Sequence, residues 1–170
     1  LNKRIVILDE GGKLIRELPV LHPDAIALSH RTGALYVTTR HGDYHRHGAV
    51  QLLKFNDWRK DDTPAEAIEV SKTAHTGKQK RSYVVVCDTD KGCNVWVAYT
   101  QMPVRIYHDA GNGLLLLKDF YRVKHAQRCL GFERMQVDPK TEEVYLLDAH
   151  DAVWKIADWK SPRLVKVPLE

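Results

Sequence analysis

Three histidines recur along this chain at nearly equal intervals. His22, His75 and His125 are separated by 53 and 50 residues, and each lies in a polar stretch just before an apolar, strand-like run. Neutral imidazole is the commonest metal ligand in proteins. Three imidazoles around an open position are what a catalytic metal needs to bind water or to polarise a substrate. The spacing therefore predicts a metal site if the fold brings the three histidines to one centre.

The strand pattern around these histidines repeats at the same interval. Each of three segments has an apolar strand, a turn rich in turn-forming residues, and a second strand with one aromatic residue between two apolar ones. These pairs of strands are expected at 25–28 with 35–37, at 83–86 with 95–97, and at 134–137 with 144–146. The sequence has no amphipathic helical pattern, so we expect an all-β protein.

A second predicted hairpin follows each of these pairs, and the chain opens with one hairpin of this second kind. The second hairpins are expected at 50–70, 104–117 and 153–167, and the opening one at 5–18. Two internal matches support the register. Residues 54–59 (KFNDWR) resemble residues 155–160 (KIADWK), 101 residues later, and residues 9–11 resemble residues 109–111, 100 residues later. A period near 50 residues is typical of stacked copies of one unit.

Four antiparallel strands per repeat at this period predict β-propeller blades. The expected organisation is a half-blade at 1–20 followed by blades at 21–71, 72–120 and 121–170. Closed propellers have about 4–8 blades, so we expect a partial β-propeller that belongs to a six- to eight-bladed ring. The first residue is not Met, and we expect the remaining blades to come from a longer form of the same protein or from another chain. An all-β sandwich is the alternative, but it would not require the period.

Two short segments resemble the NHL and gluconolactonase-type propellers. Residues 88–98 (DTDKGCNVWVA) resemble the blade motif D-x-x-G-N-[LV]-[YW]-V-A, and residues 144–149 (VYLLDA) resemble the motif [LV]-Y-x-x-D. Several propeller families share such motifs, so this resemblance implies an architecture rather than a chemistry. The placement of the histidines is similar to that in amidating-lyase-like propellers, whose metal histidines come from different blades near the mouth of the central channel.

The strands of a blade are named a to d here, from the inner strand to the outer one. Because they alternate in direction, the d-to-a and b-to-c connections emerge at one end of the blade, called the d-to-a face. His22, His75 and His125 are expected in d-to-a connections, and His45 and His150 in b-to-c loops, where they are alternate ligands. The other interpretation is that these histidines are ordinary residues of polar surface loops.

Three further candidates lie near the starts of predicted a strands. Arg81 or Tyr83 would position a substrate, and an arginine there would also suit an anionic ligand. Glu133 resembles the metal-binding glutamate that opens one blade of gluconolactonase-type hydrolases. Those enzymes also need Asn and Asp at the starts of other blades; the corresponding positions here are near Asp24 and Ser82, and a serine departs from that pattern. An ion pair between Glu133 and a neighbouring arginine is the structural alternative.

Composition narrows the function classes. The chain has 170 residues, 44% hydrophobic and 28% charged, with a net charge of +4, which is ordinary for a globular domain. The basic run at 78–81 has no nucleic-acid-binding motif beside it, so we expect no nucleic-acid partner. No apolar run approaches the roughly 18 residues of a membrane span. A hairpin disulfide between Cys87 and Cys93 is geometrically possible, but we interpret both as small apolar residues.

These observations favour a binding module. The expected function is an NHL-like propeller that binds a small ligand, a protein partner or a metal on its d-to-a face, within a larger, extracytoplasmic protein. One alternative is a metal-dependent lyase or hydrolase with a histidine-ligated divalent metal, such as zinc, on the propeller axis. The other is a non-catalytic structural scaffold. The chain has no nucleophile elbow, P-loop or dinucleotide fingerprint, so no organic cofactor is indicated.

Overall fold

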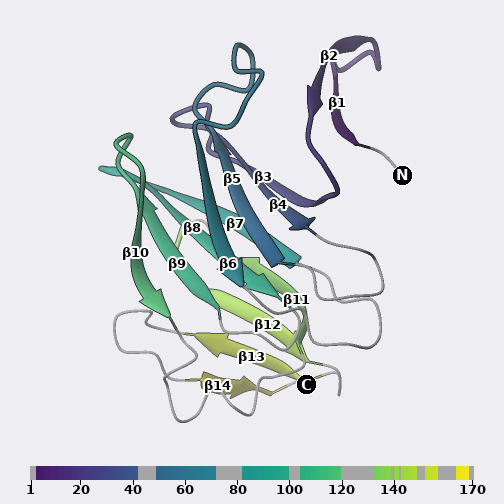
Figure 1. Ribbon diagram of the computed structural model, residues 1–170. Helices are drawn as coiled ribbons and strands as arrows, with labels where there is room; N and C mark the ends of the chain where they lie inside the picture. Colours follow the sequence, from purple (N-terminus) through teal and green to yellow (C-terminus); the bar gives the residue numbers. More distant parts are fainter. Residues whose placement is uncertain are drawn as a thin grey trace. The chain divides into compact units, whose positions relative to one another are not determined.

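The fold of the chain is seen in a computed structural model (Figure 1), which describes residues 3–41, 49–71, 82–99, 104–119, 132–138, 140–141, 143–148, 152–156 and 164–168. Within these ranges every regular element is a β-strand. No helix in this part of the chain is long and apolar enough to cross a membrane. The all-β prediction is therefore confirmed for the described residues.

The strands form one two-stranded hairpin and three four-stranded antiparallel sheets (Figure 1). The hairpin consists of β1 (Arg4–Leu8) and β2 (Leu14–Pro19). The first sheet has β3 (Pro23–Leu28), β4 (Leu35–His41), β5 (Ala49–Phe55) and β6 (Glu66–Ser71). The second has β7 (Ser82–Thr89), β8 (Gly92–Tyr99), β9 (Arg105–Asp109) and β10 (Leu114–Asp119). The third has β11 (Phe132–Val137), β12 (Val144–Asp148), β13 (Val153–Ile156) and β14 (Leu164–Val167).

Each sheet is a meander, because its strands are neighbours in sequence order. Each meander has the four antiparallel strands that are expected of one blade. The chain divides into two compact units, Leu1–Gln79 and Lys80–Glu170. The first holds the hairpin and the β3–β6 sheet, and the second holds the other two sheets.

In the first unit the β1–β2 hairpin packs against the β3–β6 sheet. Ile5 and Leu18 of the hairpin join Val37 and Phe55 of the sheet in one apolar cluster. Leu18, Val37 and Phe55 are fully buried, and burial of one such side chain stabilises the fold by roughly 1.5–3 kcal/mol. Strand alternation explains the choice of residues, since every second residue of β1 points to the sheet.

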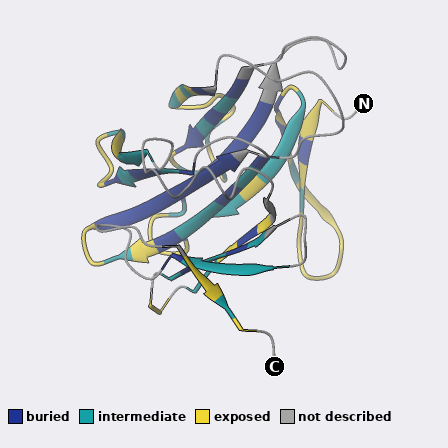
Figure 2. Cartoon of the chain, turned by 90° about the horizontal axis from the view of Figure 1, so that it is seen from below, coloured by how far each residue is buried: buried dark blue, intermediate teal, exposed yellow. Residues whose placement is uncertain are grey.

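In the second unit the β7–β10 and β11–β14 sheets pack face to face. Trp96 and Ile106 of one sheet meet Met135 and Leu146 of the other in a single cluster, and the first strands of the two sheets, β7 and β11, lie against each other. β8 is buried on both of its faces, since all residues from 92 to 98 are buried. Figure 2 shows this pattern, with buried residues along the central strands and exposed ones in turns and outer strands.

The two cysteines that flank the β7–β8 turn point to opposite faces of their sheet. Cys87 pairs with Asn94 and belongs to the apolar cluster of the second unit, whereas Cys93 pairs with Asp88. Neither cysteine is in a disulfide, and both side chains are fully buried. Cys87 is an apolar core residue, as interpreted, and the register places the two thiols on opposite faces, where they form no hairpin disulfide.

Several turns between strands are closed by a side chain at their first residue. The Asp9 carboxylate accepts a hydrogen bond from the Lys13 main-chain N–H at 2.8 Å, and the Asp109 carboxylate accepts one from the Gly111 N–H at 2.7 Å. The Ser29 hydroxyl accepts one from the Thr32 N–H at 3.1 Å. Short polar side chains of this kind stabilise turns by replacing backbone partners. These are turns that the sequence predicts.

Candidate functional site

Most of the predicted d-to-a face belongs to connections outside the described residues. His45, His75, His125, His150 and Arg81 all lie there. The structure therefore neither brings the three predicted metal histidines together nor separates them, and their convergence stays a prediction. Within the described ranges, no group of three or more His, Cys, Asp or Glu side chains is placed to hold a metal ion.

His22 is the one predicted ligand that the structure describes. It lies between β2 and β3, directly before the a strand of the first sheet, which is the predicted position. Its φ angle is 51°, and it is the one non-glycine residue with positive φ among the residues described. A residue before proline normally adopts an extended conformation, and a left-handed non-glycine residue costs of order 1–3 kcal/mol. His22 is therefore held in a strained backbone conformation at the start of β3.

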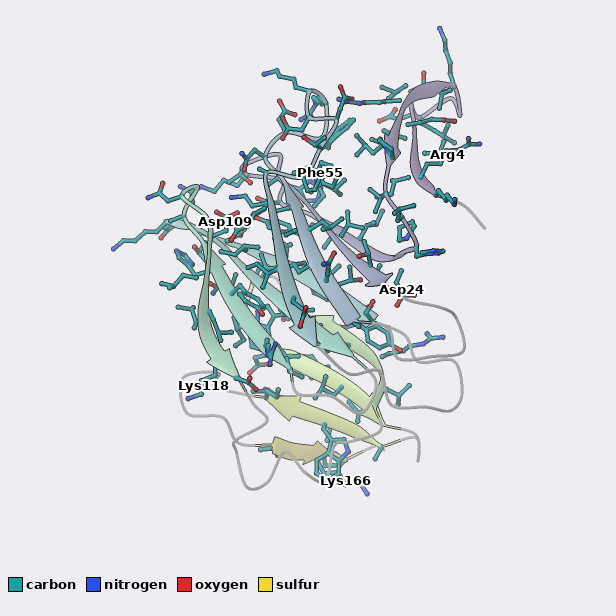
Figure 3. All side chains as sticks on the ribbon, in the orientation of Figure 1. Arg4, Asp24, Phe55, Asp109, Lys118 and Lys166 are labelled. Carbon is teal, nitrogen blue, oxygen red and sulfur yellow. The ribbon has the colours of Figure 1, made fainter. Side chains whose placement is uncertain are left out.

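A β-bulge follows immediately. Pro23 pairs with Thr39 and Ala25 pairs with Thr38, so Asp24 is an extra residue without a cross-strand position of its own. Figure 3 labels Asp24 at the beginning of β3. Bulges turn a side chain away from the regular alternation and are enriched near functional sites. The bulge therefore sets the direction of the Asp24 side chain independently of the strand that follows.

The two threonines opposite this bulge differ in their hydrogen bonds. The Thr38 hydroxyl accepts a hydrogen bond from the Ala25 N–H at 3.1 Å and lies 3.3 Å from the Ala25 carbonyl oxygen, to which it donates. The Thr39 side chain is 1% exposed, and its hydroxyl oxygen has no hydrogen-bond partner within the described structure. A buried hydroxyl without a partner costs about 1–3 kcal/mol. Thr39 thus leaves an unused polar group beside the start of β3.

The same irregularity recurs at the start of the third sheet. Phe132 pairs with residue 148 and Arg134 with residue 147, so Glu133 is the extra residue of a bulge in β11. Asp24 and Glu133 therefore occupy equivalent positions in their own sheets. The start of β7 is regular, because Ser82 and Tyr83 pair in sequence with residues 99 and 98. Sequence analysis matched Asp24, Ser82 and Glu133 as strand starts but missed both bulges, since a one-residue register shift leaves no compositional signal.

Tyr83 has a structural environment. It is half-buried and packs against the apolar cluster that contains Trp96 and Met135. Ser82, its neighbour, is buried. This packing gives the Tyr83 ring a role in the contact between the two sheets, whether or not a substrate reaches it.

Three titratable groups interact on the outward face of the third sheet. The Lys155 Nζ lies 2.5 Å from Glu143 Oε1, and the Tyr145 hydroxyl donates a hydrogen bond to Glu143 Oε2 at 2.9 Å. The hydrogen bonds from Lys155 and Tyr145 lower the pKa of Glu143, and the carboxylate in turn raises the pKa of both partners. A protonated lysine and a neutral tyrosine are poor bases and nucleophiles. This triad is therefore a structural ion-pair network and not an activated catalytic group.

Sequence analysis also missed this triad. Tyr145 and Lys155 are direct cross-strand partners, and Glu143 lies two residues before Tyr145 on the same face. Their proximity follows from the β12–β13 register, which the period-2 pattern alone does not fix.

Comparisons with known proteins bear on the fold. No protein-family model matches the sequence, and no curated protein matches it. Among solved structures, the chain is similar to a 6-phosphogluconolactonase-like protein from Bacteroides uniformis, with a TM-score of 0.56 and 12% identity over 96% of this chain and 49% of that one. It is also similar to the WD40 domain of SCAP from fission yeast, with a TM-score of 0.54 and 12% identity over 96% of this chain and 39% of that one.

Both neighbours have propeller-type folds, and at this level of identity the likeness concerns the fold alone. Together with the four-stranded meanders, it identifies the chain as a partial β-propeller. The predicted fold class is thereby confirmed. The chain spans about half the length of the first neighbour and less of the second. The finer resemblance to NHL-type propellers stays a prediction.

Proposed function

We propose that the chain is an NHL-like β-propeller module of a larger protein that binds a ligand, a protein partner or a metal on its d-to-a face. The observation that carries this proposal is the concentration of unfavourable local features at the start of β3. His22 has a left-handed backbone, Asp24 occupies a bulge, and Thr39 has a buried hydroxyl without a described partner.

These three features lie at one end of one sheet. Pro23, between His22 and Asp24, is the direct cross-strand partner of Thr39. Strain of this kind persists where the surrounding structure or a function maintains it. An imidazole, a carboxylate and a hydroxyl together suit a polar ligand or a metal ion more than an apolar one. The turns that begin at Asp9, Ser29 and Asp109, by contrast, are closed by their own side chains.

The enzyme alternative is a metal-dependent lyase or hydrolase with a divalent metal, such as zinc, held by His22, His75 and His125. His45 and His150 are alternate ligands, and Arg81, Tyr83 or Glu133 would act on the substrate. The strained backbone of His22 supports this alternative, because it fixes an imidazole directly before an a strand. Three imidazoles would leave an open coordination position for water.

Metal analysis of the protein purified without a histidine tag tests these functions. Stoichiometric zinc, copper or iron that is lost in His22→Ala and in His125→Ala supports the metal site. His30→Ala is the matched control, because His30 is an exposed residue of the β3–β4 turn, at the other end of the same sheet. Metal-free protein whose melting temperature does not change with chelator excludes the metal alternative.

The same variants separate a binding module from a scaffold. Small molecules and proteins that co-purify with the native protein are identified. The same is then done for a variant that carries both His22→Ala and Asp24→Asn. Loss of a bound component in the double variant, with retention in His30→Ala, supports a site at the start of β3. Identical recovery from all three proteins contradicts it and favours the scaffold.

A further inference from the structure

No strand among the described residues pairs with the outer edge of β1, and the hairpin has an exposed apolar face. We propose that the edge of β1 pairs with two further β-strands, supplied from outside residues 1–170, and that these strands turn the hairpin into a four-stranded sheet. The inference rests on the fold and not on the proposed ligand site. Its test measures strand pairing at β1, so the two proposals can fail separately.

The backbone polar groups of β1 define the edge. The Lys3 carbonyl accepts a hydrogen bond from the Val20 N–H at 3.2 Å, and the Asp9 N–H donates to the Lys13 carbonyl at 2.9 Å. Because an antiparallel ladder alternates, the odd residues of this strand direct their N–H and C=O groups toward β2. The even residues Arg4, Val6 and Leu8 direct theirs to the other side, where no described strand pairs with β1.

The side chains of β1 are apolar on both faces. Ile5 and Ile7 point inward to the cluster that the hairpin shares with the β3–β6 sheet. Val6, Leu8 and Leu14 point the other way and are 48%, 53% and 53% exposed. A strand with one solvated face alternates apolar and polar residues, whereas a strand buried on both faces is apolar throughout. β1 therefore has the sequence of a strand that is covered on both sides.

A charged rim bounds the outward face. Arg4 and Glu17 form an ion pair at 3.3 Å at the end of the hairpin that is remote from its turn. Figure 3 shows the labelled Arg4 extending from the hairpin. An apolar centre with a polar margin is the usual composition of a protein interface.

The equivalent strands of the other sheets indicate what pairs with the edge of β1. β5, β9 and β13 are third strands, and each pairs on its inner side with a second strand, β4, β8 or β12. The β1–β2 hairpin resembles these outer pairs in sequence but has no inner pair among the described strands, and an isolated two-stranded hairpin is at best marginally stable. The two solved propellers continue well beyond the region that this chain matches. The occupant that fits is therefore an inner pair of strands.

The hairpin is held in place for such docking. The Arg16 guanidinium on β2 donates hydrogen bonds to the main-chain carbonyls of Trp58 at 3.2 Å and Asp61 at 2.9 Å, and it also contacts the Asp62 carboxylate. These contacts tie β2 to the β5–β6 loop. An edge that is already positioned loses less conformational entropy on binding.

A preformed hairpin provides the probe. We would use a synthetic peptide with residues 132–148 of this chain, the β11–β12 inner pair, closed by a disulfide between cysteines added at its two ends. Its fold is first checked by NMR. The expected result is saturable binding to the 170-residue chain, together with slowed hydrogen exchange at the amides of Arg4, Val6 and Leu8.

Variants at one position distinguish strand pairing at the edge of β1 from non-specific binding. Val6→Pro removes an outward N–H and leaves the inward ladder intact, so binding of the probe should fall at least about tenfold, or about 1.4 kcal/mol. Val6→Thr keeps that N–H and a β-branched side chain and should retain binding. Val6→Lys places a charge on the outward face and should weaken binding as well. The melting temperature of each variant confirms that the hairpin still packs on its sheet.

Three results would overturn the proposal. The first is no binding of a probe that NMR shows to be folded. The second is binding that Val6→Pro leaves unchanged, or that protects another edge strand with exposed apolar side chains, such as β10, instead of β1. The third is a concentration-dependent dimer in which the same three amides are protected and the probe does not compete, because the occupant would then be a second copy of this chain.

Discussion

A Cβ atom placed on Gly92 would lie 2.0 Å from the main-chain carbonyl oxygen of Asp109. Gly92 begins β8 with a φ of 135°, and its neighbour Cys93 is the direct cross-strand partner of Asp109. The β7–β8 turn therefore packs against the backbone where β9 ends. This contact joins the inner and outer hairpins of the second sheet at their turns, and it leaves no room for a side chain.

Gly92→Ala should destabilise the protein by about 3 kcal/mol or more, because both the backbone conformation and the contact with Asp109 must change. Urea unfolding followed by fluorescence measures the loss. Gly111→Ala, in the neighbouring turn of the same sheet, is the control: its φ is 96°, but no atom lies within 4 Å of the added Cβ. That variant should lose only about 1–2 kcal/mol from left-handed strain. Equal losses in the two variants would contradict the close contact.

Arg16→Ala should destabilise the first unit by about 2 kcal/mol, because it removes charge-assisted hydrogen bonds to three main-chain carbonyls and leaves those carbonyls without that donor. Arg16→Lys should recover less than half of the loss, since an ammonium group cannot reproduce the guanidinium fork. Thermal unfolding measures both variants. Arg59, whose guanidinium lies over the exposed side of the Trp58 ring at 4.5 Å, provides the control. If Arg59→Ala cost as much as Arg16→Ala, the hydrogen bonds would not be the cause.

Thr39→Val should raise the melting temperature, because valine has the shape of threonine without the buried hydroxyl that lacks a described partner. Thr38→Val should lower it, since that hydroxyl both accepts from and donates to Ala25. Differential scanning calorimetry of the two variants measures the contrast at adjacent positions. A fall in stability in Thr39→Val would show that its hydroxyl has a partner. Thr39 would then no longer support a ligand site at the start of β3.

The repeat unit could be predicted from the sequence because strand composition and turn chemistry are local properties. The aromatic residue Trp96 between Val95 and Val97 predicts a strand, and the turn-forming residues that follow Asp109 predict a turn. The details that shape the candidate site are not local. The bulges at Asp24 and Glu133 are one-residue shifts in pairing, and the contacts of Arg16 join residues more than 40 positions apart. The apolar residues of β8 are local in sequence, but the strands and sheets that bury its two faces are not.

Neither Cys87 nor Cys93 should react with a thiol reagent in the folded protein, and both should react after unfolding in urea. Their full burial excludes the reagent, and the strand register directs the two thiols to opposite faces of the sheet. Mass spectrometry after labelling, with and without prior reduction, identifies each site. A linked Cys87–Cys93 peptide in the unreduced sample would contradict this register.

The stability of the protein should depend on Glu143 in the acid range. Hydrogen bonds from Lys155 and Tyr145 lower the pKa of Glu143 below its ordinary value of 4.5. A carboxyl group with a lowered folded-state pKa contributes stability that is complete above its unfolded-state pKa and is lost as the pH falls through the folded-state pKa. The melting temperature of the native protein should therefore decline below about pH 4.5, and Glu143→Gln should be less stable at pH 7 with a shallower decline on acidification. Calorimetry between pH 7 and pH 3 measures both curves, with Glu10→Gln, in the exposed β1–β2 turn, as the control. Parallel curves for the native protein and Glu143→Gln would show that the triad does not contribute to folding.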